Sequence, residues 1–125
     1  MRAPELLPAL RVVAAPEALD DLTLADEHAA LRLAPDDMLV IGAASAQVVG
    51  EHLLVDEAGF VGWWLTPDEV REHVLPHIDW PLPTSRPALA QGLVAGVPAK
   101  LWLAEDRALL LCSAAYAHEL MERLP

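Results

Sequence analysis

The sequence predicts an α+β fold, a mostly antiparallel sheet with its helices packed on one face. Three observations predict it. An apolar run at residues 61–65 leads directly into a strong helix-start signal, three strand-like runs follow one another between residues 89 and 112, and residues 113–124 return to a helical period. We therefore expect a ferredoxin-like strand-helix-strand-strand unit, followed by one more strand and a closing helix.

The helix-start signal after residue 65 is the clearest local feature of the chain. Thr66 is a good N-cap, Pro67 suits the first helical position, and Glu69 stands where a capping box needs it. Val70 begins the apolar face of this helix, and Pro76 marks its expected end.

The strands on either side follow from short apolar runs bounded by turn residues. Residues 10–15, 38–41 and 52–55 have strand composition. The last three strands are expected at residues 89–95, 97–104 and 107–112, with Pro98 at a strand start or on an edge. Ser113 is the expected cap of the closing helix.

The length of 125 residues indicates one domain, 1–125. Residues 1–34 have the weakest pattern, and we expect them to form an N-terminal arm or a peripheral element. Residues 35–125 would then form the core of the domain.

Composition excludes several classes of function. Nineteen acidic residues against eight basic ones give a net charge of −11, which argues against nucleic acid or an anionic membrane as partner. No apolar run approaches the roughly 20 residues that span a bilayer. The single cysteine, Cys112, suits a reducing compartment, so we expect a cytoplasmic protein in which Cys112 is a small buried side chain.

The tryptophans are the main candidates for a ligand or interface site. Trp63 and Trp64 are adjacent in a strand and must point to opposite faces of the sheet. If helices cover one face, one of the two faces solvent, a ligand or another chain, unless the N-terminal segment covers it. Trp102 poses the same question, and Trp80 in the proline-rich connector 77–87 is a further candidate.

Polar candidates are fewer. Asp56 lies near His52 in a turn-forming stretch, where acid–base work and ordinary turn chemistry are the two explanations. His73 and His77 have the i,i+4 spacing of metal ligands, but Pro76 lies between them. We expect solvated histidines there, no metal site and no catalytic residue of this chain alone.

Five segments, in order, resemble gamma subunits of heterotetrameric sarcosine oxidase. Residues 33–42 resemble the family's Gly-Pro-Asp-Glu-Trp stretch and leucine-rich strand, and residues 55–68 resemble its next turn, strand and helix start. The connector 78–83 is similar to Leu-Asp-Leu-Pro. The hairpin 93–102 shares Gly-Val-Pro, and residues 114–124 resemble the closing helix.

This resemblance implies the fold of the folate-binding domain of glycine-cleavage T-protein relatives. It also implies a non-catalytic accessory subunit that docks against itself or against flavoprotein oxidase subunits, within an oxidoreductase complex. The alternative is a small tetrahydrofolate-handling, aminomethyltransferase-like protein, in which Asp56 and the tryptophans line a pteridine pocket.

Overall fold

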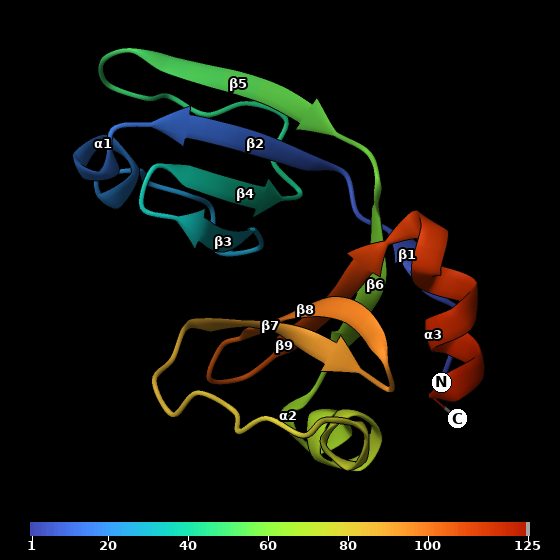
Figure 1. Cartoon of the computed structure of the whole chain (residues 1–125). Coiled ribbons are helices and arrows are strands. Elements are labelled where there is room, and N and C mark those ends of the chain that lie inside the picture. Colours follow the sequence, from blue (N-terminus) through green and yellow to red (C-terminus); the bar gives the residue numbers. More distant parts are fainter. Residues whose placement is uncertain (125) are drawn as a thin grey trace. The chain divides into compact units, whose positions relative to one another are not determined.

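The computed structural model describes residues 1–124 and confirms a mostly antiparallel α+β fold (Figure 1). Over these residues the strands form two antiparallel sheets, of five and four strands. The chain divides into two compact units. One contains residues 1–6 and the chain from Phe60 onward, and the other contains Leu7–Gly59.

The five-stranded sheet belongs to the first unit. Its order is β1 (Glu5–Leu6), β6 (Phe60–Leu65), β9 (Ala108–Ser113), β8 (Val97–Leu103) and β7 (Ala88–Val94). The strand-helix-strand-strand order holds along the chain for β6, the helix, β7 and β8, and β9 pairs between β6 and β8. The three predicted consecutive strands are therefore confirmed as β7, β8 and β9.

The predicted helix start is confirmed. The Glu69 amide donates to Thr66 Oγ1 over 3.1 Å, and the Thr66 amide donates to Glu69 Oε1 over 3.0 Å, which completes the capping box. Helix α2 (Pro67–Glu69) continues as a π turn, η1 (Val70–Val74), and a 3₁₀ turn, η2 (Leu75–His77). Pro76 therefore lies inside the helical run, near the start of the 3₁₀ turn, where its missing N–H removes no bond.

The closing helix consists of a 3₁₀ turn, η3 (Ala114–Tyr116), and α3 (Ala117–Arg123). Ser113 is the last residue of β9 and stands at the N-cap position of η3, as predicted, but its side chain makes no cap bond. The helices pack on one face of the sheet over a core of buried residues: Val61, Trp63, Leu65, Val70, Val74, Val94, Val97, Ala99, Leu101, Leu103, Ala108, Leu110, Cys112, Leu120 and Leu124.

The four-stranded sheet belongs to the second unit, with the order β3 (Ala29–Ala34), β4 (Asp37–Ile41), β2 (Ala9–Ala14) and β5 (His52–Glu57). Helix α1 (Pro16–Asp20) contributes Leu19 to its core, which also contains Leu10, Val12, Ala14, Met38, Val40 and Ala43. The predicted strands at 10–15, 38–41 and 52–55 are confirmed.

The region expected to be an arm or peripheral element differs from that expectation. Strand β2 lies inside residues 1–34, yet it pairs with β4 on one side and β5 on the other. Val12 is fully buried. The residues of this six-residue run pair with partners 24 to 48 positions further along the chain. No local pattern shows those partners. Within residues 1–124, no helix has the length and apolar character needed to cross a membrane.

Candidate functional site

Strand β5 is an edge strand with apolar side chains in solvent. Leu53, Leu54 and Val55 are 58%, 37% and 41% exposed. Within residues 1–124 the strand pairs with β2 alone, so its outer edge presents unpaired backbone groups. An exposed apolar edge of this kind is a template for pairing with another polypeptide.

The other three sheet edges are each short, irregular or covered. Strand β1 has only two residues, Glu5 and Leu6. Strand β3 is interrupted by a register irregularity between Arg32 and Ala34, and the Arg32 guanidinium donates to the carbonyls of Ala34 and Pro35. These are recognised ways of preventing edge-to-edge pairing.

Trp80 obstructs the fourth edge, on β7. Its indole N–H donates to the Leu93 carbonyl over 3.0 Å. The indole lies so close to Gly92 that a Cβ at that position would stand 2.6 Å from Trp80 Nε1. Gly92 therefore marks a close approach, as a glycine inside a strand often does. Trp80, a predicted site residue, is half-buried against the sheet that it covers.

Asp56 lies in β5 and is exposed. It lies two positions after Leu54 and four positions after His52, so all three side chains share one face of the strand. His52 Nδ1 is 2.8 Å from the Gly50 carbonyl oxygen. All four tryptophans belong to the other unit.

The adjacent tryptophans point to opposite faces of the five-stranded sheet, as predicted. Trp63 is 1% exposed within the core, and its indole N–H donates to the Arg2 carbonyl over 2.7 Å. Trp64 lies on the other face, edge-to-face with Trp102 at a centroid distance of 6.1 Å. The Arg107 guanidinium lies 4.6 Å and 5.4 Å from these two ring centroids, in cation–π contact.

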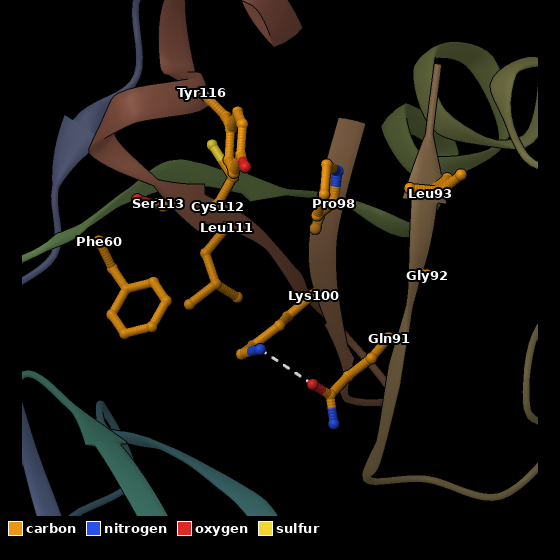
Figure 2. A pocket seen from close by; sticks show the side chains of 11 residues that line it. Phe60, Gln91, Gly92, Leu93, Pro98, Lys100, Leu111, Cys112, Ser113 and Tyr116 are labelled. Atoms are coloured by element: carbon orange, nitrogen blue, oxygen red, sulfur yellow. Dashed lines mark hydrogen bonds between the residues drawn. The ribbon is translucent and has the colours of Figure 1, made fainter. Parts of the chain in front are cut away.

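A groove of about 420 Å³ lies on the five-stranded sheet near the start of the closing helix (Figure 2). Its lining is mainly apolar and includes two aromatic rings, and one polar pair crosses it, in which Lys100 Nζ donates to Gln91 Oε1 over 2.9 Å. The lining residues are Phe60, Gln91, Gly92, Leu93, Pro98, Ala99, Lys100, Leu111, Cys112, Ser113 and Tyr116.

The Cys112 thiol is a poor nucleophile. The residue is 2% exposed, and burial raises the pKa of its thiol, because a thiolate would lose solvation there. Cys112 is therefore the small buried side chain that the sequence predicts, although its residue borders the groove.

His73 and His77 do not belong to a cluster of metal-ligating side chains in the described part of the chain. Across residues 1–124, no three His, Cys, Asp or Glu side chains come together as metal ligands would. His73 lies in the π turn and His77 ends the 3₁₀ turn, on either side of Pro76.

No protein-family model, curated protein or solved structure matches this chain. The function is therefore inferred from the geometry of β5 and of the groove.

Several residues of these sites were missed in the sequence. The run Leu53-Leu54-Val55 reads as a buried strand, because three consecutive apolar residues are typical of one. Lys100 and Tyr116 are distant in sequence and meet only through the pairing of β8 with β9. The one local signal was Gly92, whose place inside a strand indicates a close neighbour.

Proposed function

We propose that this protein is a non-catalytic binding module that docks another polypeptide through β5. The proposal agrees with the accessory role that the resemblance to sarcosine oxidase gamma subunits implies. The observation that carries it is the contrast among the sheet edges. Three are short, irregular or covered, while β5 exposes Leu53, Leu54 and Val55 beside unpaired backbone groups.

Docking by strand addition would use both features of β5. Backbone groups along the open edge would bind an extended segment and provide affinity, while the side chains of alternate residues would provide specificity. Exposed leucine and valine side chains are stabilised when a partner removes them from water. A partner could be a second copy or a flavoprotein oxidase subunit.

The test is affinity purification with quantitative mass spectrometry on three forms of the chain. A lysine at position 54 would place a charge in the apolar run, so we expect Leu54→Lys to lose the partner that the wild type recovers. Val49→Lys is the matched control, because Val49 is 86% exposed in the loop before β5. Equal recovery by all three forms would contradict the proposal.

The groove supports a second candidate function, the binding of a pteridine such as tetrahydrofolate. Phe60 and Tyr116 offer aromatic faces on which a planar ring could stack, and Lys100 would attract the carboxylates of the folate tail. In this arrangement the chain holds the ligand and supplies no catalytic group.

Calorimetric titration with tetrahydrofolate tests this second function. We expect saturable micromolar binding that weakens by about tenfold in Tyr116→Ala and in Lys100→Ala, since each removes about one good contact. Arg86→Ala, which removes a basic residue outside the groove lining, is the control. Heat changes that do not saturate with the wild type would rule this function out.

A further inference from the structure

We propose that the partner of β5 is a second copy of this chain. The two β5 strands would pair antiparallel about a two-fold axis through Leu54 and join two four-stranded sheets into one continuous sheet. This inference rests on the proposed docking function of β5 and names its partner. Closed two-fold pairing of this kind is the commonest form of self-association.

The direction of the backbone groups restricts how two β5 strands can pair. The Gly42 amide donates to the Pro8 carbonyl over 2.8 Å, and the Ala14 amide donates to the Asp36 carbonyl over 3.2 Å. Even-numbered residues of β2 therefore direct their backbone groups to β4, and odd-numbered residues direct theirs to β5.

The same alternation continues across to the open edge. Leu53 and Val55 lie opposite the odd residues Val13 and Arg11, so their backbone groups face β2. His52, Leu54 and Asp56 direct their N–H and C=O groups outward. A second β5 can therefore bond only in registers that place these even-numbered residues opposite one another.

Among the allowed registers, the side chains favour the one centred on Leu54. It places Leu54 opposite Leu54 of the second copy, with Leu53 and Val55 opposite each other on both sides of the axis. It also places each His52 opposite an Asp56, an imidazole facing a carboxylate.

The two neighbouring allowed registers pair the side chains less favourably. A shift of two residues in one direction sets Leu54 opposite Asp56, and the opposite shift sets it opposite His52. Each places the most central apolar side chain against a polar one and leaves fewer apolar pairs across the strands. The sequence of β5 is thus complementary to itself in one register.

Cysteine cross-linking tests the register directly, in a Cys112→Ala background. Hydrogen-bonded residues in an antiparallel pair have Cα atoms about 5.5 Å apart, within disulfide range. We expect Leu54→Cys to form a covalent dimer under mild oxidation. Leu53→Cys alone should not, but a mixture of Leu53→Cys with Val55→Cys should. Val49→Cys, more exposed but outside the strand, is the control for random collision.

Sedimentation velocity separates failure of this inference from failure of the docking function. We expect a concentration-dependent dimer for the wild type and Val49→Lys, and at least about tenfold weaker association for Leu54→Lys, which sets two lysines face to face. Self-pairing would be overturned by a wild type that stays monomeric, or by cross-linking of Val49→Cys as extensive as that of Leu54→Cys. The docking function would then stand if Leu54→Lys still lost another partner in the affinity purification, and would fall if it did not.

Discussion

Strands β5 and β7 are both outer strands with exposed apolar side chains, yet a tryptophan side chain covers only the edge of β7. On β7 the Trp80 indole bonds the Leu93 carbonyl, and Gly92 leaves room for the indole to lie against the strand. Strand β5 has no equivalent within residues 1–124: its neighbours on the chain are a glycine-containing loop and the turn before Phe60. An exposed apolar side chain therefore does not by itself identify a docking edge. Leu93 is 56% exposed, yet it lies on β7, whose edge Trp80 already covers.

The largest effect is expected when the cover of β7 is removed. Trp80→Ala deletes the indole packing and leaves the Leu93 carbonyl without its donor, so the free energy of unfolding should fall by about 2–3 kcal/mol. Urea denaturation followed by circular dichroism measures it, with Tyr116→Ala as the control for loss of an exposed aromatic ring. This variant should also gain self-association through β7, because the backbone edge of β7 is then uncovered. Unchanged stability would show that Trp80 does not hold this edge.

A smaller effect is expected when the indole is displaced but kept. The Cβ in Gly92→Ala would stand 2.6 Å from Trp80 Nε1, so the ring must shift and lose its bond, at about 1–2 kcal/mol. Gly59→Ala is the matched control, because a Cβ at that position would have no atom within 4 Å apart from those of Gly59 and its chain neighbours. Equal unfolding midpoints for the two variants would contradict the close approach.

Opening the β3 edge should lower the free energy of unfolding by less than either change at β7. Arg32 donates to the carbonyls of Ala34, Pro35 and Pro16 from the strand edge. Arg32→Ala should lower the free energy of unfolding by about 1 kcal/mol and speed hydrogen exchange in β3. Arg86→Ala removes an arginine that also bonds two carbonyls, those of Pro83 and Ser85, but within its own loop. Exchange in β3 that is the same in both variants would count against an edge role for Arg32.

The smallest change in stability is expected near β1. Just before this strand, the Arg2 guanidinium donates to the Glu69 carboxylate and to the Trp64 carbonyl. The Thr66 amide, followed by Arg2, lowers the pKa of Glu69. Because folding lowers the pKa of Glu69, its carboxylate contributes to stability at pH values above the pKa of the unfolded state, about 4.3. This contribution to stability is lost as the pH falls through the pKa of the folded state. Glu69→Gln should flatten this acid dependence and cost below about 0.5 kcal/mol at pH 7. Glu119→Gln, on exposed α3 surface, is the control, and an identical acid slope in both variants would refute the assignment.

The α+β class and most strands could be predicted because their signals are local. The capping box of Thr66 and Glu69 lies within four residues, and Gly96 marks the turn between β7 and β8. The division of strands between two sheets could not be predicted, since β2 pairs with β4 and β5 across long stretches of chain. For the same reason, the groove lined by Lys100 and Tyr116 could not be predicted from the sequence.

The sequence by itself determined that a capped helix follows an aromatic strand and that Trp63 and Trp64 face opposite ways, because both depend on neighbouring residues only. Only the tertiary structure decided which edge stays open. Leu53, Leu54 and Val55 have the composition of a buried strand, yet they are exposed on β5, which is an outer strand of its sheet. The burial of a segment depends on what packs against it. The order of the strands in the sheet decides this, and it involves residues far apart in the chain.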